Sequence, residues 1–215
     1  MRYVVLDTET TGLDPDDGHK IIEIGCIEIL NRAITDNTFH KYLNPQREID
    51  IEASKIHGLT YSNLKDKPIF EEVHQEFLDY IGDSPIIIHN APFDLGFLNK
   101  EFSLFSKTDV LSKNEIIDSL KLARKLSPGK RNTLDALCER YSIDNSDRSL
   151  HGALLDAELL AFVYLKMTIG QNDFTGLTID KNITNIDSKI NDDNFKIIKP
   201  SNQEKELHLS YFKKD

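Results

Sequence analysis

The stretch YVVLDTETTGL, residues 3–13, places two carboxylates, Asp7 and Glu9, directly after a run of four apolar residues. Such a run without polar alternation is typical of a strand that is covered on both faces. Because the two acids are two residues apart, their side chains would point to the same face of that strand. Their mutual repulsion and lost hydration would be relieved by a divalent cation between them. An edge strand with solvated acids would also fit, so this stretch alone leaves both interpretations open.

Length and composition limit the classes of protein to be considered. The 215 residues fit one domain of about 170 residues with a tail, or two small domains, and the 11 phenylalanines allow a proper core. There is no apolar run of 18 residues and no signal-like N-terminal region, so we expect a cytoplasmic protein without a membrane span. Cys26 and Cys138 are isolated and predict buried thiols, not a zinc site or a disulfide framework.

The net charge of −10 bears on any partner. A protein that holds nucleic acid by neutralising phosphates is usually basic. Any grip of this chain on nucleic acid must therefore be local, carried by bound metals, or supplied by a partner.

The pattern along the chain predicts an α/β fold with a mixed five-stranded sheet flanked by helices. Strands are expected at residues 2–7, 20–31, 34–43, 85–90 and 115–118. Helices are expected at 50–56, 69–81, 93–105, 119–126, 132–141 and 152–169. The last of these helices is apolar on nearly every side, which predicts a position inside the core.

Two further acids stand out. Asp94 follows the fourth expected strand and lies in the first turn of a helix, where a carboxylate also serves as a simple capping acid. Asp156 lies within the most apolar helix of the chain, where a charge is costly unless it is paired or bound to a metal. A functional role is the favoured interpretation for Asp156, and a buried arginine partner is the competing one.

His151 precedes Asp156 by five residues, a spacing that turns two side chains to different faces of a straight helix. Both can serve one site only if His151 lies on the loop that enters the helix, and Gly152 permits such a loop. A loop histidine that titrates near neutral pH is a suitable general base, although a surface histidine is the commoner case.

The four acids Asp7, Glu9, Asp94 and Asp156 provide hard oxygen ligands, which favour Mg²⁺ or Mn²⁺ over zinc. Two such ions are the usual arrangement for in-line phosphoryl transfer, because one activates water and the other stabilises the leaving oxygen. In this hypothesis His151 takes the proton of the water.

Three segments carry a family resemblance: DTETTGL at 7–13, HNAPFD at 89–94 and HGALLD at 151–156. They resemble the three exonuclease motifs of the Asp-Glu-Asp-Asp-His superfamily. Over about residues 2–170 the chain is most similar to the epsilon family of bacterial DNA polymerase III, which are proofreading 3′→5′ exonucleases. The resemblance implies a ribonuclease H-like sheet, two divalent metals, and a terminal nucleotide held at the carboxylates.

By the same resemblance, Glu52 and His57 match positions that contact the terminal nucleotide, beside Asp7, Glu9 and Asp156. On the strand, the Thr8 side chain should face away from the two acids and pack, so only its backbone would reach the nucleotide. Leu13 is a candidate wedge against the terminal base.

Residues 1–170 are expected to form the exonuclease domain, and residues 171–215 a polar tail with an apolar end at 207–212. The family docks its C-terminal region on the polymerase subunit, and it also binds a sliding clamp and a small stabilising subunit. Its clamp-binding segment has a Gln followed by spaced apolar residues. The segment at 171–177 has the Gln and two apolar residues, but the second follows at a longer spacing.

Two alternatives remain beside a DNA proofreading exonuclease. An RNA-trimming 3′→5′ exoribonuclease of the same superfamily would use the same site chemistry, although the tail favours a tethered subunit. A binding module that has lost catalysis is disfavoured, because all four acids and the histidine are present.

Overall fold

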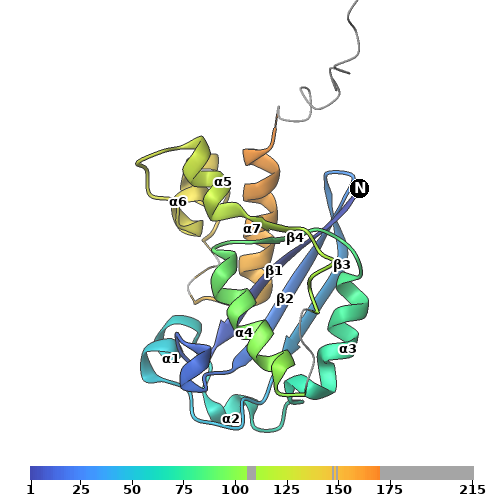
Figure 1. Cartoon of the computed structure of the whole chain (residues 1–215). Coiled ribbons are helices and arrows are strands. Elements are labelled where there is room, and N and C mark those ends of the chain that lie inside the picture. Colours follow the sequence, from blue (N-terminus) through green and yellow to red (C-terminus); the bar gives the residue numbers. More distant parts are fainter. Residues whose placement is uncertain (106–109, 147, 149, 170–215) are drawn as a thin grey trace, which may run out of the picture. The chain divides into compact units, whose positions relative to one another are not determined.

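The computed structural model describes residues 1–105, 110–146, 148 and 150–169. They form a mixed five-stranded sheet in the order β3-β2-β1-β4-β5 (Figure 1). β1 is antiparallel to β2 and parallel to β4. The strands are β1 (Arg2–Thr10), β2 (Ile21–Leu30), β3 (Ala33–Tyr42), β4 (Ile86–Ile88) and β5 (Ile116–Asp118).

Helices connect and cover the strands. The elements are the 3-10 turn η1 (Pro15–Asp17) and the helices α1 (Ile51–His57), α2 (Tyr61–Leu64), α3 (Phe70–Ile81), α4 (Ala91–Ser103), α5 (Ser119–Leu126), α6 (Leu134–Tyr141) and α7 (Ala153–Met167). None of the helices in the described ranges has the length and hydropathy needed to cross a bilayer.

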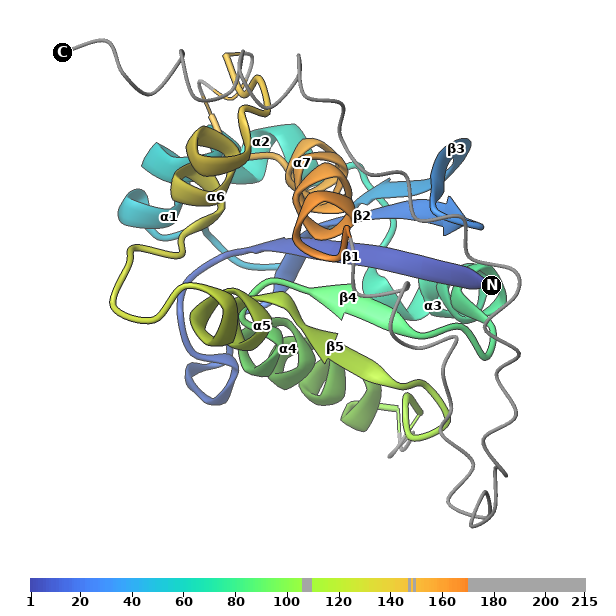
Figure 2. The same cartoon turned by 90° about the horizontal axis from the view of Figure 1, so that it is seen from above.

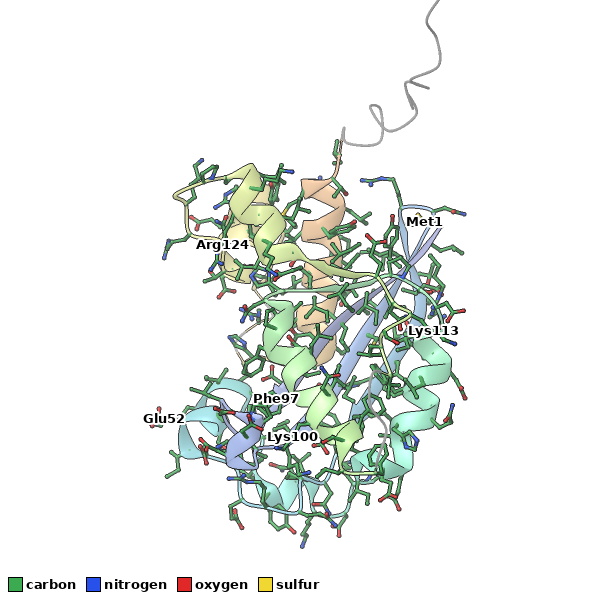
Figure 3. The ribbon with its side chains drawn as sticks, in the orientation of Figure 1. Met1, Glu52, Phe97, Lys100, Lys113 and Arg124 are labelled. Atoms are coloured by element: carbon green, nitrogen blue, oxygen red, sulfur yellow. The ribbon has the colours of Figure 1, made fainter. Side chains whose placement is uncertain are left out.

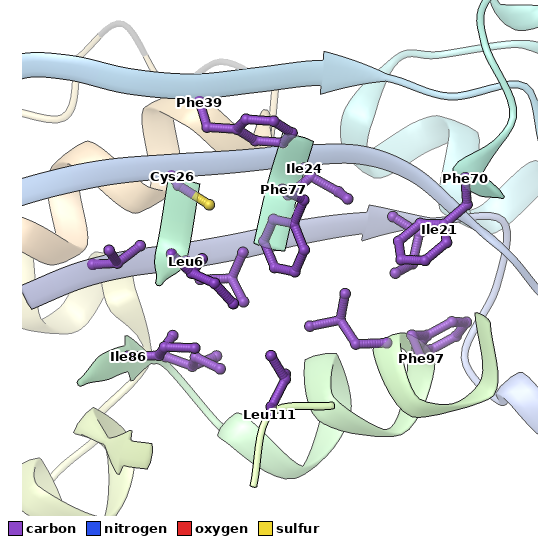
Figure 4. Packing of buried hydrophobic residues seen from close by; sticks show 14 of the residues in the cluster. Leu6, Ile21, Ile24, Cys26, Phe39, Phe70, Phe77, Ile86, Phe97 and Leu111 are labelled. Atoms are coloured by element: carbon purple, nitrogen blue, oxygen red, sulfur yellow. The ribbon is translucent and has the colours of Figure 1, made fainter. Parts of the chain in front are cut away.

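The sheet separates two hydrophobic cores, and Figure 2 shows α7 and α4 on opposite sides of β1. Val4 and Leu6 belong to the core under α3 and α4, which is rich in phenylalanine (Figure 4). Val5 belongs to the core formed with α6 and α7. Because side chains alternate along β1, residues of odd number face α7 and residues of even number face α4.

The predicted fold class is confirmed, and the helix and strand positions differ only in detail. β1 continues to Thr10, three residues beyond its predicted end, because it pairs with β2 along this whole length. α4 begins at Ala91 instead of residue 93, since Asn90 adopts a left-handed conformation (φ 67°) and Pro92 fits the first turn. The short elements η1 and α2 were not predicted. The segments 171–177 and 207–212 lie outside the described residues.

α7 approaches the sheet closely at one point, Gly25 of β2. A Cβ placed on Gly25 would lie 2.3 Å from the Ala153 carbonyl carbon and 2.3 Å from the Leu154 backbone nitrogen. Gly25 is also the direct partner of Asp7 in the β1–β2 register. The missing side chain therefore lets the first turn of α7, which carries Asp156, lie directly against the acidic end of β1.

Gly25→Ala should destabilise the protein by about 2 kcal/mol or more, because the new methyl group meets backbone atoms that cannot rotate away. The change should also lower nuclease activity by displacing the start of α7. Gly96→Ala is a matched control: its added Cβ would lie 3.8 Å from the Pro15 side chain, and it should stabilise α4 by roughly 0.5–1 kcal/mol. Denaturant unfolding of both variants tests this, and equal stability of the two would contradict the role of Gly25.

Candidate active site

Three of the predicted site residues meet on the α7 face of the sheet. Asp7 and Glu9 have odd numbers on β1 and so face α7, and Asp156 lies in the first turn of that helix. Potential ligand atoms of Glu9, His151 and Asp156 lie within 4.8 Å of one another. Strand alternation and one helix turn thus bring together residues that are separated by up to 149 positions, from 7 to 156.

Asp94 reaches the same cavity from the first turn of α4. Its Oδ1 accepts a hydrogen bond of 2.7 Å from the Thr8 hydroxyl, inside the protein. Thr8 does face away from Asp7 and Glu9, as strand alternation requires, and its buried side chain makes this hydrogen bond in addition to packing. The even-numbered side chains of β1 face α4, so the Thr8 hydroxyl can hold Asp94 in the first turn of that helix.

The carboxylates strongly affect one another's protonation. Burial, then the charges of Asp94, Asp156 and Glu9, raise the pKa of Asp7 well above its ordinary value. Burial and the charges of Asp156 and Glu23 raise the pKa of Glu9 to about 8. Burial raises the pKa of Asp94 to about 7, against the opposing hydrogen bond from Thr8. Without a cation, these acids resist ionisation at neutral pH.

An arginine that carries no motif signal, Arg148, enters this acidic cluster. Its Nε and Nη2 donate to the two oxygens of Asp156 at 2.5 and 2.7 Å, and its Nη1 donates to Asp135 at 2.5 Å. Burial alone would raise the pKa of Asp156, but the bonds from Arg148 and His151 outweigh it and lower that pKa. Asp156 therefore has the buried arginine partner that was the competing interpretation, and it also lines the cavity with the other acids.

The guanidinium of Arg148 does not neutralise the negative charge of the whole acidic cluster. Arg148 lowers the pKa of Asp156, yet the pKa values of Asp7, Glu9 and Asp94 stay raised in its presence. The remaining oxygens form a donor set of the kind that hard divalent cations prefer. The carboxylates present therefore fit a site for hard divalent cations, with His151 beside them.

His151 lies at the entrance to α7 and not on the helix, as its spacing from Asp156 required. Its backbone N–H donates to the Ile56 carbonyl at 3.0 Å, which joins the loop to α1. Its Nδ1 lies 3.3 Å from Asp156 and 3.0 Å from Arg148 Nη2, and its side chain is 42% exposed. The imidazole is therefore in contact with both the acidic cluster and solvent.

These groups open into a cavity of about 1040 Å³. The four acids, Thr8 and His151 line it together with His89, Asn90, Phe93, Leu120, Arg124, Pro128, Gly129, Lys130, Asn132, Thr133, Leu134, Asp135 and Arg148. The motif HNAPFD supplies four of the lining residues, whereas the basic residues of the α5–α6 turn were not predicted as site residues. Their signal was a cluster of positive charge in an acidic sequence.

Glu52, His57 and Leu13 are not among the lining residues of this cavity. Glu52 is exposed on α1 and pairs with Lys55 at 2.7 Å (Figure 3). His57 ends α1 in a buried position, and its Nδ1 accepts from the Leu59 N–H. Within the described residues its Nε2 has no partner with hydrogen-bond geometry, although the Thr10 backbone partly opposes the lowering of the His57 pKa by burial. Leu13 is 82% exposed. Their contact with a nucleotide stays a prediction.

Glu23 is a buried acid that the motifs did not reveal. It lies directly opposite Glu9 in the β1–β2 register, and its Oε1 contacts His40 Nε2 at 2.7 Å. Two carboxylates at such paired positions repel each other, which adds to the raised pKa of Glu9. The position of Glu23 opposite Glu9 follows from the register of β1 and β2, which the sequence pattern did not define.

Comparison with known proteins places these features in a family. Residues 4–164 match the family model described as Exonuclease (RNase_T). DNA polymerase III subunit epsilon of Rickettsia typhi is 48% identical over 100% of this chain and 96% of its own length. The same subunit of Escherichia coli K12 is 56% identical over 79% of this chain and 72% of its own length.

A solved structure titled exonuclease X in complex with 5′ overhanging duplex DNA has 27% sequence identity and a TM-score of 0.63 to this chain. The alignment covers 82% of this chain and 94% of the exonuclease X chain. The structure of cell-death related nuclease 4 has a TM-score of 0.67 at 16% identity, which supports the fold alone. With a matching family model and near full-length relatives, this chain belongs to the exonuclease family and, within it, to the DNA polymerase III epsilon subunits.

Proposed function

We propose that this chain is a proofreading 3′→5′ exonuclease that removes mispaired 3′-terminal nucleotides of DNA as nucleoside 5′-monophosphates. The observation that carries the proposal is the convergence of Asp7, Glu9, Asp94 and Asp156 beside His151. Family membership supports the reaction and the DNA substrate. A cytoplasmic location is part of the proposal and fits the two free, buried thiols.

In this proposal the four acids hold two divalent cations, Mg²⁺ or Mn²⁺. Bound there, such ions supply a nucleophilic water and charge stabilisation of the leaving 3′ oxygen. His151 removes the proton of the water. Since its Nδ1 contacts Asp156 and Arg148, Nε2 is the nitrogen that we assign to take the proton.

The other residues predicted for the site have supporting roles. Thr8 fixes Asp94 through its hydroxyl. Glu52, His57 and Leu13 are proposed to meet the terminal nucleotide. His57 is near His151, because the carbonyl of the preceding residue, Ile56, accepts the hydrogen bond from the His151 backbone. Its buried Nε2 gives it a polar atom that a ligand could satisfy.

The direct test compares a 3′-mispaired DNA primer with an RNA oligomer of equal length. We expect the purified chain to degrade the DNA primer in Mg²⁺, and Asp7→Ala to abolish this activity. His151→Ala should lower the rate by about 10²–10⁴-fold, as expected for loss of a general base. A preference for RNA by orders of magnitude would instead support the RNA-trimming alternative.

Metal binding should depend on pH in a defined direction. Glu9 and Asp94, with pKa values of about 8 and about 7 in the metal-free chain, must lose protons when a cation binds. The apparent affinity for Mn²⁺ should therefore rise at least about tenfold between roughly pH 6 and pH 8.5.

The same linkage predicts that the folded metal-free chain holds more protons than the unfolded chain, so its stability falls as pH rises through about 7–8. The pH dependence of metal binding is measured by calorimetric titration of the chain with Mn²⁺ in buffers of different ionisation enthalpy, which gives both the affinity and the number of protons released. Asp156→Asn should weaken binding, whereas His151→Ala should spare it. Affinity that is independent of pH would contradict the assignment of these acids as ligands.

We further propose that residues 171–215 dock the chain on a polymerase catalytic subunit, and that a small stabilising subunit and a sliding clamp are additional partners. Relatives that align along nearly their whole length support this assembly. The full chain should co-purify with a co-expressed polymerase catalytic subunit, and a chain ending at residue 170 should not. Equal co-purification of both forms would place the contact elsewhere.

A further inference from the structure

A basic surface borders the carboxylate site. In this acidic chain, residues 121–140 contain six basic and only two acidic side chains. One of the two acids, Asp135, is already paired with Arg148. We call the basic residues of this segment, which includes parts of α5 and α6 and the turn between them, the basic rim: Lys121, Arg124, Lys125, Lys130, Arg131 and Arg140.

Two members of the basic rim, Arg124 and Lys130, line the same cavity as Asp7 and Glu9. Both are exposed, and neither has an ion-pair partner within 4.0 Å among the residues that the structure describes. Figure 3 shows Arg124 on α5. The cavity is thus lined both by the four acids and by these two cations, which have no ion-pair partner among the described residues.

The turn that carries Lys130 is held in place by its own hydrogen bonds. Arg140 donates to Asn132 Oδ1 at 2.9 Å, and Asn132 donates to the Lys130 carbonyl at 2.9 Å. Gly129 provides the positive φ of 75° that the turn needs. A backbone fixed in this way lowers the entropy cost of binding a ligand.

Helix electrostatics explain only part of the basic rim. Arg124 and Lys125 lie in the last turn of α5, where cations interact favourably with the helix dipole. Lys130 and Arg131 lie beyond the end of that helix. The convergence of Arg124 and Lys130 on one cavity therefore needs another explanation.

We propose that the basic rim binds the sugar-phosphate backbone of the strand whose 3′ end occupies the carboxylate site. Arg124 and Lys130 would bind the phosphates nearest to the terminal nucleotide. The inference rests on the proposed function and adds to it the surface that guides the strand. Guanidinium and ammonium groups bind phosphodiesters without reading bases, which suits an enzyme that must accept any sequence.

The test uses the full chain, the double variant Arg124→Ala/Lys130→Ala and the control Lys113→Ala/Lys65→Ala. The control cations are exposed and do not line the cavity. Two substrates are compared: a short single-stranded DNA, and the p-nitrophenyl ester of thymidine 5′-monophosphate, which has no upstream phosphate.

For the rim variant, KM for the DNA should rise roughly tenfold or more, and the salt dependence of binding should lose about 1.4 from its log–log slope, since two phosphate contacts are removed. Hydrolysis of the mononucleotide ester should be unchanged. The control variant should behave as the unmodified chain on both substrates.

An unchanged KM and salt slope in the rim variant would overturn the inference. So would an equal loss on both substrates, because the rim would then act on the carboxylate site or on folding. An acidic peptide that competes as strongly as DNA of equal charge would also overturn it, in favour of a protein partner.

Failure of the proposed function itself is distinguishable. In that case the unmodified chain would cleave neither substrate, while fluorescence anisotropy with labelled DNA would still measure binding by all three proteins. Weaker binding by the rim variant alone would then support the rim, and equal binding by all three would refute it.

Discussion

The repulsion among four carboxylates at the end of β1 is the constraint on which the site depends. Asp7 and Glu9 are fixed by strand alternation, Asp94 by its bond from Thr8, and Asp156 by the docking of α7. Each position is thus set by an element of the core, and the side chains of Glu9, Asp94 and Asp156 are buried. The repulsion between their ionised forms is therefore built into the fold, and it is relieved either by protonation, as the raised pKa values of Glu9 and Asp94 indicate, or by a bound cation.

Arg148 shows how the chain tolerates this constraint before a cation binds. A bidentate guanidinium is the strongest partner that a side chain can offer a carboxylate. Its bond to Asp135, whose side chain is 59% exposed, provides a second partner outside the cluster. Arg148 therefore keeps an acidic partner even when Asp156 serves another ligand, and the arginine need not become an unpaired buried charge.

The elements and the four acids could be predicted because their signals are local. An apolar run gives β1, the i, i+2 spacing puts Asp7 and Glu9 on one face, and the apolar setting of Asp156 marks it as costly. Arg148 and Glu23 could not be predicted, because each acquires its role only from the tertiary register. The bond from Thr8 to Asp94 could not be predicted for a related reason: alternation shows which face a side chain takes, but not which helix covers that face.

The distribution of charge also explains how an acidic protein can act on a polyanion. The net charge of −10 opposes binding of nucleic acid at a distance, and the carboxylates repel phosphate until cations fill the site. The basic rim places two cations, Arg124 and Lys130, beside the cavity. A strand would thus be held weakly along its length and firmly only at a 3′ end that reaches bound cations. Such weak retention suits an exonuclease that must act on frayed ends and leave paired DNA to its polymerase.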